Sequence, residues 1–193
     1  MNIIDTLKPS QIKLTKRSSY KKGTVLYREN DKCKSICVLL KGKLNIVTYL
    51  EDGNEVVYNT IKENEMFGNN LIFSSAPYYK GNIISLEDSE IISIDSNALL
   101  TILSNNQEFM IEYLKQSSDF TKVLNNKIKL LSIQSAEERL YFYLHENDNT
   151  VEFSSISDLA KQLYLQRETL SRLISKLVKQ KKIKKHANQI QLL

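Results

Sequence analysis

Short runs of β-branched and aliphatic residues recur through the first half of the chain, and turn residues separate them. The runs lie at 24–27, 35–40, 44–50, 55–61, 82–86 and 91–94. Asp52-Gly53-Asn54 stands between two of them, and Asp-Gly in that place favours a hairpin turn. Strands at this spacing are typical of a β-sandwich or barrel. Residues 20–95 are therefore predicted to form an all-β domain.

A helical pattern replaces the strand pattern after Ser96. Residues 107–132 contain no Gly or Pro and carry two apolar stripes, and a helix with two such stripes buries two sides. We expect one stripe to pack on the β-domain and the other, with heptad spacing, to pair with a second copy. A single broad stripe in a monomer core is the alternative. The heptad seam is Met110, Leu114, Ser117, Thr121, Leu124, Ile128 and Leu131, and the second stripe is Phe109, Tyr113, Phe120, Val123 and Leu130.

The C-terminal pattern predicts short helices followed by a hairpin. Ser135 and Glu138 form a capping box that starts a new helix, which puts a boundary near residue 133. Two more helices with a tight turn fill 154–180, and 181–185 with 189–193 are predicted as a β-hairpin wing. The helices' apolar faces consist of Ile156, Leu159, Ala160 and Leu163, then Leu170, Leu173, Ile174 and Leu177.

Charge is distributed unevenly along the chain. The whole chain of 193 residues has a formal net charge of +5. Residues 154–193 hold nine Lys or Arg and two acids, which gives +7 there and about −2 for the rest. Such an asymmetry indicates that the C-terminal end meets a polyanion.

The second C-terminal helix carries side chains suited to the major groove of DNA. Glu168, Arg172 and Lys176 share one side at i, i+4 and i+8, beside Arg167. Arg can bond guanine O6 and N7, and Glu can accept from cytosine N4. A solvated charged helix face is the plain alternative. The predicted DNA-binding residues are Gln166, Arg167, Glu168, Thr169, Ser171, Arg172 and Lys176, with Lys184 and Lys185 of the wing along phosphates.

Other functional classes find little support in the sequence. No apolar run reaches eighteen residues and the N-terminus lacks a signal peptide, so a cytoplasmic protein without a membrane partner is expected. Walker, GxSxG, HExxH and GxGxxG motifs are absent, and an enzyme is not expected. Cys33 and Cys37 with His145 and His186 make no metal-ligand cluster. A structural role for the cysteines is favoured over a thiol sensor.

The order of β-domain, long helix and winged helix resembles the Crp/Fnr family of bacterial transcription regulators. The resemblance covers almost the whole chain. It rests most on Arg167-Glu168-Thr169-Leu170-Ser171-Arg172, with Lys22-Gly23, Leu40-Lys41-Gly42, Met66-Phe67-Gly68, Glu138-Arg139-Leu140 and Asp158-Leu159-Ala160. It implies that Arg167, Glu168 and Arg172 read a G·C-containing half-site resembling TGTGA.

The chain departs from the family at the positions that name an effector. Cyclic-AMP readers of the family carry Glu where Asn69 stands, and Arg-Ser near Tyr79-Lys80. Lys lacks the bidentate fork of Arg, so cyclic AMP is not expected. Two cysteines cannot supply an iron–sulfur cluster, and no haem signature is present. Tyr164 also replaces the usual Gly of the helix-turn-helix turn, where φ > 0 is needed.

Together these patterns predict an α+β protein in three parts. Residues 1–106 form a jelly-roll sensor domain (a double-stranded β-helix), 107–133 a dimerisation helix, and 134–193 a winged helix-turn-helix. The expected partners are double-stranded DNA and a second copy, with RNA polymerase and an unknown small-molecule effector implied by the resemblance. Two alternatives are an effector-independent regulator and a sensing module whose basic end docks a protein. The expected effector pocket is Phe67, Gly68, Asn69, Asn70, Tyr79, Lys80, Leu124 and Ile128.

Overall fold

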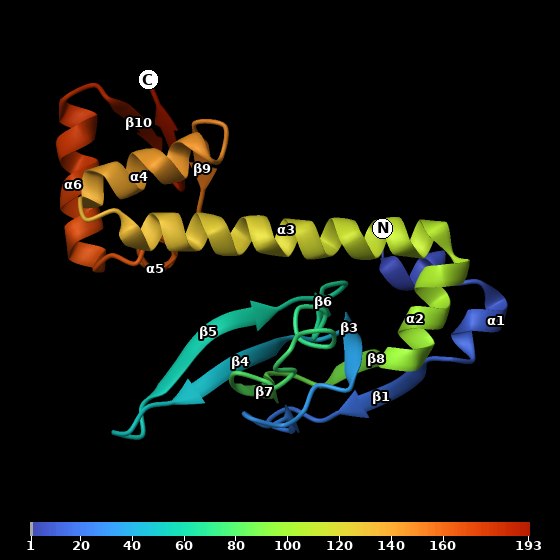
Figure 1. Ribbon diagram of the computed structural model, residues 1–193. Coiled ribbons are helices and arrows are strands. Elements are labelled where there is room, and N and C mark those ends of the chain that lie inside the picture. The colour runs from blue at the N-terminus through green and yellow to red at the C-terminus, as the bar shows by residue number, and fades with distance from the viewer. Residues whose placement is uncertain (1) are drawn as a thin grey trace. The chain divides into compact units, whose positions relative to one another are not determined.

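The computed structural model describes residues 2–193 and divides into two compact units, Met1–Asp119 and Phe120–Leu193. The division falls inside a single long helix, α3 (Gln107–Ser132), labelled in Figure 1. The α+β fold class is confirmed: the N-terminal unit is mainly β-sheet and the C-terminal unit mainly helix.

Two antiparallel four-stranded sheets make the jelly roll of the N-terminal unit. Their strand orders are β1-β8-β3-β6 and β2-β7-β4-β5. The aliphatic strands face inward, and Ile36, Leu39, Leu44 and Ile83 are almost fully buried. The strands are β1 (Lys16–Tyr20), β2 (Val25–Tyr27), β3 (Ser35–Lys41), β4 (Leu44–Tyr49), β5 (Glu55–Ile61), β6 (Met66–Phe67), β7 (Asn82–Ser85) and β8 (Ser89–Asp95).

Short helices cover one end of this unit. They are the 3-10 helix η1 (Ile3–Thr6), α1 (Pro9–Ile12) and α2 (Ser96–Asn105). Asp95 caps α2, because its carboxylate accepts from the N–H groups of Asn97 and Ala98. Buried Asn106 does the same for α3 by accepting from the Phe109 N–H, while its amide donates to the Thr6 carbonyl and to Gln11.

Left-handed turns in this glycine-poor chain fall on asparagine as well as on glycine. Gly42 has φ +98° and lies against Ser89, where a Cβ would stand 2.9 Å from the Ser89 Cα. Asn30 and Asn64 have φ of 67° and 68°. Asn tolerates this region because its short side chain can hydrogen-bond locally.

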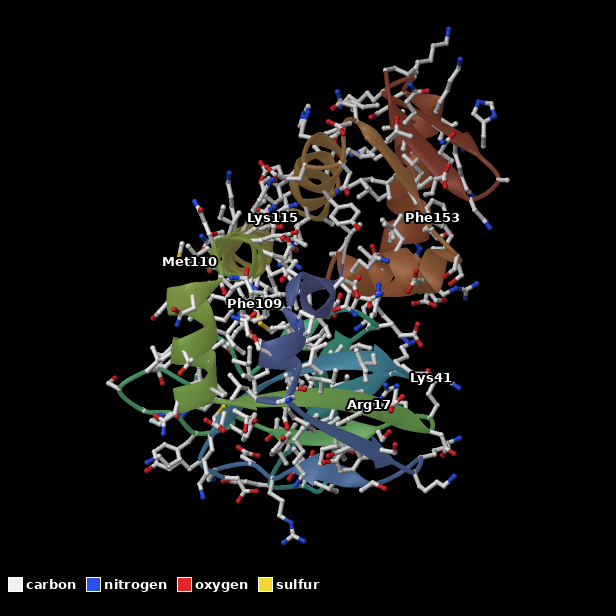
Figure 2. The ribbon with its side chains drawn as sticks, turned by 90° about the vertical axis from the view of Figure 1, so that its right-hand side faces the viewer. Arg17, Lys41, Phe109, Met110, Lys115 and Phe153 are labelled. Carbon is white, nitrogen blue, oxygen red and sulfur yellow. The ribbon has the colours of Figure 1, made fainter. Side chains whose placement is uncertain are left out.

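Helix α3 matches the predicted helix, but its second stripe is divided. Phe109 and Tyr113 are buried in the core of the N-terminal unit, and Figure 2 shows Phe109 on a different side of α3 from Met110. Leu130 is buried in the core of the C-terminal unit. Val123, between them, is 63% exposed. The expectation that this whole stripe packs on the β-domain was therefore wrong.

The C-terminal unit is a winged helix-turn-helix. Ser135 caps α4 (Ala136–His145) by accepting from the Glu138 N–H, one of the two bonds of the predicted capping box. The helices α5 (Ile156–Gln162) and α6 (Arg167–Lys179) follow. A three-stranded sheet in the order β10-β11-β9 closes the unit, with β9 (Thr150–Glu152), β10 (Ile183–His186) and β11 (Gln189–Leu192).

Candidate nucleic-acid interface

The turn between α5 and α6 is a left-handed C-cap built without glycine. Tyr164 has φ +54°. Its N–H donates to the Lys161 carbonyl, and the Leu165 N–H reaches back to the Ala160 carbonyl at 2.9 Å. These two bonds are those of a Schellman motif, which usually takes Gly at its left-handed position. Tyr164 thus adopts the positive φ that the usual Gly of this turn would supply.

Arg139 of α4 fixes the same turn from outside. Its Nη1 donates to the Tyr164 carbonyl at 2.9 Å and, more weakly, to the Leu163 carbonyl at 3.5 Å. Its Nε donates to the Ile133 carbonyl at 2.6 Å. One guanidinium therefore joins the start of α4 to the turn that aims α6. In the sequence, Arg139 stands out only as part of the fragment Glu138-Arg139-Leu140.

Helix α6 buries one face and presents the other to solvent. Leu170, Ile174 and Leu177 lie in the core of the unit. Arg167 and Glu168 lie 3.9 Å apart with side chains about two-thirds exposed, so their ion pair is weak and both stay accessible. The other residues predicted to contact DNA from this helix are also exposed: Gln166, Thr169, Ser171, Arg172 and Lys176. Part of this face forms an open groove of about 560 Å³, lined by Ser171, Arg172, Ser175, Lys176, Lys179 and Gln180.

The wing places basic side chains on an exposed strand. Lys184 and Lys185 lie on β10, opposite Gln191 and Ile190 of β11. Both lysines are exposed. The wing was predicted from its lysines and turn. Its first strand, β10, starts two residues later than the predicted 181, and its second, β11, starts at the predicted 189.

Two basic side chains of this surface are held by one carboxylate. Glu137 of α4 accepts from Lys176 Nζ at 2.9 Å and from Lys182 Nζ at 3.2 Å. The hydrogen bond from Lys176, and then that from Lys182, holds the pKa of the Glu137 carboxyl below its ordinary value.

Aromatic and thiol side chains fill the interior of the jelly roll, and Phe67 and Tyr79 of the expected effector pocket are among them. Tyr79 is buried and stacks on Tyr27 with ring centroids 4.7 Å apart, and Phe67 meets Tyr27 edge-on. The Tyr27 hydroxyl lies 3.2 Å from Cys37 Sγ. Both cysteines are buried and free, and burial raises the pKa of the Cys37 thiol to about 12.

The residues of the expected pocket differ widely in their surroundings. Gly68 is buried, where a Cβ would stand 2.9 Å from the Ser35 carbonyl oxygen. Asn69 Nδ2 donates to Ser117 Oγ of α3 at 3.1 Å, and the Tyr113 hydroxyl lies 3.4 Å from the Asn69 carbonyl oxygen. Lys80 and Asn70 are exposed. Leu124 and Ile128, the other two residues of the prediction, belong to the second unit.

The heptad seam of α3 is largely exposed in the single chain. Leu114 is 55% exposed and Ile128 is 62% exposed. Leu124 and Leu131 are exposed as well. Large apolar side chains in a row on one helix face are those that a partner would cover.

Comparison with known proteins agrees with this architecture. Residues 17–106 match the cyclic nucleotide-binding domain family. The anaerobic regulatory protein of Bacillus subtilis is 27% identical over 176 residues, covering 86% of this chain and 74% of that protein. The resemblance to the Crp/Fnr family is confirmed.

Solved structures share the same fold over the full chain. A CooA variant from Carboxydothermus hydrogenoformans has a TM-score of 0.68 at 17% identity and covers all of this chain and 91% of its own. The catabolite activator protein of Thermus thermophilus has a TM-score of 0.57 at 16% identity, covering all of this chain and 94% of its own. Among the helices of residues 2–193, none is long and apolar enough to cross a membrane.

Proposed function

We propose that this chain is a homodimeric, sequence-specific DNA-binding transcription regulator. The observation that carries the proposal is α6, where a buried leucine face opposes exposed Arg167, Glu168 and Arg172. A helix of this kind fits the major groove, and its charged side chains match guanine and cytosine edges. The exposed lysines of the wing supply phosphate contacts, which position the domain without reading sequence.

Two copies of the chain act together in this proposal. The exposed seam at Leu114, Leu124, Ile128 and Leu131 supports pairing through α3. Two recognition helices related by a twofold axis read half-sites about one helical turn of DNA apart, so the target is a palindrome. RNA polymerase is a further partner that the family resemblance suggests.

Selection of bound duplexes from random oligonucleotides, with purified protein and no added effector, tests this function. The expected product is a palindromic consensus with a G·C pair in each half-site. Arg167→Ala should lose about 1–3 kcal/mol of discrimination at one position per half-site and keep weak, salt-sensitive binding. Arg28→Ala removes the same charge from an exposed position in the β-domain and should leave the consensus unchanged. An unchanged consensus for Arg167→Ala would refute its role.

A second proposal concerns control: the regulator binds DNA without a cyclic nucleotide. Asn69, where cyclic-AMP readers carry Glu, donates its side-chain amide to Ser117, and its backbone carbonyl lies 3.4 Å from the Tyr113 hydroxyl, so both groups are already bonded to α3. The Tyr79–Tyr27 stack occupies the interior nearby, and Lys80 stays in solvent. These residues do not suit a cyclic nucleotide, which supports control without one.

Binding isotherms with and without cyclic AMP and cyclic GMP test the control proposal. We expect full affinity for the selected site in the purified protein alone and no thermal shift with either nucleotide. Asn69→Ala should weaken binding to that site, because the joint with α3 is lost, whereas Asn70→Ala is the matched neighbour. A cyclic nucleotide that tightens DNA binding would refute the proposal.

A further inference from the structure

Glu137 lies where α4, α6 and the start of the wing meet. Its two carboxylate oxygens face two different lysines: Oε2 faces Lys176 of α6, and Oε1 faces Lys182 just before β10. The Tyr141 hydroxyl donates to Oε1 at 3.3 Å. The Glu137 side chain is 24% exposed, less than half the exposure of either lysine.

Local structure sets the place of Lys182 before any ion pair forms. Helix α6 ends in a second Schellman motif, with Lys181 at φ +57°. The Lys182 N–H donates to the Leu177 carbonyl, and the Lys181 N–H donates to the Val178 carbonyl. The turn therefore fixes the position of Lys182. Lys176 lies in the last turn of α6, shortly before it. Glu137 reaches both because α4 packs against α6.

The two ion pairs of Glu137 contribute little to the stability of the C-terminal unit. The contact between α4 and α6 is already made by buried Leu140, Leu144, Ile174 and Leu177. Ion pairs between side chains as exposed as these add little to stability, because water and salt screen them. The positive charge of the two lysines has more consequence, because Lys176 lines the open groove on the exposed side of α6 and Lys182 adjoins the wing.

We propose that Glu137 tunes specificity by pairing Lys176 and Lys182, which keeps two cations from non-specific phosphate contact. The inference rests on the proposed DNA binding. Phosphate contacts supply nearly all non-specific affinity, whereas base contacts by Arg167 and Arg172 supply discrimination. A carboxylate that neutralises two phosphate-seeking lysines lowers affinity for random DNA more than affinity for the palindrome. Glu137 acts through the lysines and is a positioning residue.

Glu137→Gln and Glu138→Gln form a matched pair for the test. Both remove one negative charge from the first turn of α4, but only Glu137 bonds the two lysines. Fluorescence anisotropy with a random-sequence duplex, over a series of salt concentrations, measures the difference. Two added phosphate contacts steepen log K against log salt by about 1.8. The affinity advantage of Glu137→Gln over wild type should then shrink about tenfold from ~50 to ~200 mM salt. Glu138→Gln should stay within about twofold of wild type.

A double-variant background separates this role from a structural one. With Lys176→Gln and Lys182→Gln both present, Glu137→Gln should no longer steepen the salt dependence. The proposal would be overturned if log K fell equally steeply with log salt for Glu137→Gln and Glu138→Gln. It would also be overturned if Glu137→Gln bound random DNA more weakly than wild type. Thermal unfolding of each variant shows that it is folded.

Retention on a heparin column keeps this inference distinct from the proposed function. Glu137→Gln should elute at higher salt than Glu138→Gln even if no palindrome is selected, because heparin is itself a polyanion. If random oligonucleotides yield no consensus while the heparin difference holds, the regulator function fails and the lysine pairing stands. If a consensus appears without any difference between the two variants, the pairing fails alone.

Discussion

Tyr164 has a left-handed backbone conformation in the helix-turn-helix turn. At this position a glycine variant of the protein should be more stable than an alanine variant. Tyr164 has φ +54°, a conformation that costs a residue with a Cβ about 1–2 kcal/mol. Glycine avoids this cost but loses about 0.4–1 kcal/mol through the greater freedom of its unfolded chain. Tyr164→Gly should therefore unfold with a free energy roughly 1 kcal/mol higher than Tyr164→Ala. In most helical or extended positions the sign would be the opposite.

The comparison of two variants isolates the backbone term from loss of the ring. Tyr164 also has Lys127 Nζ 5.6 Å above its ring, a contact of about 0.5–1 kcal/mol at an exposed site that both variants lose equally. The Arg139 bond to the carbonyl of residue 164 is kept in both.

Urea unfolding followed by far-ultraviolet circular dichroism measures the difference, and hydrogen exchange of the α5 and α6 amides locates it. Lys181 supplies an internal repeat, because it holds the same place in the C-cap of α6 with φ +57°. An alanine variant as stable as the glycine variant at position 164 would refute the reasoning.

Three further outcomes follow from burial and close contact. Cys33 and Cys37 should not react with a thiol reagent at pH 8 in the native protein and should both react in denaturant, because both are buried and the pKa of Cys37 is raised to about 12; fast native labelling would instead support a thiol sensor. Ile128→Glu should shift the sedimentation coefficient from dimer to monomer, since that side chain is 62% exposed in one chain, and an unshifted value would exclude the seam. Gly42→Ala should lower the free energy of unfolding by about 2–4 kcal/mol through φ +98° and the contact with Ser89, measured by urea midpoint; a wild-type midpoint would show that the strand yields.

Much of the fold was predictable because its elements have strong periodic patterns. The helix at 107–132 and the strand at 55–61 coincide with α3 and β5. The first strand, β1, was missed because Lys16–Tyr20 is an edge strand of mostly polar, exposed residues. The two-residue β6 and three-residue β9 are too short to show a period.

In the candidate site, features set by local spacing could be predicted from the sequence, and contacts between distant residues could not. The exposed row on α6 was visible in the sequence, because helical spacing alone separates its charged face from its leucines. The Glu137 pairing was not visible, since its lysines are 39 and 45 residues away and charge counts give no direction to a side chain. The clamp by Arg139 was hidden for a related reason: its acceptors are backbone carbonyls, which no residue type reveals.

If the exposed seam of α3 pairs two copies, as proposed, the amount of protein in the cell becomes a control variable. In the proposed homodimer, the seam of α3 gains packing from the second chain, because side chains such as Leu114 and Ile128 are mostly uncovered in one copy. Folding and pairing are then linked by mass action, so the melting temperature rises with protein concentration. Where dimers are scarce, occupancy of a palindrome grows with the square of the monomer concentration. Under the proposed pairing, occupancy of the target therefore responds steeply to synthesis of the regulator itself.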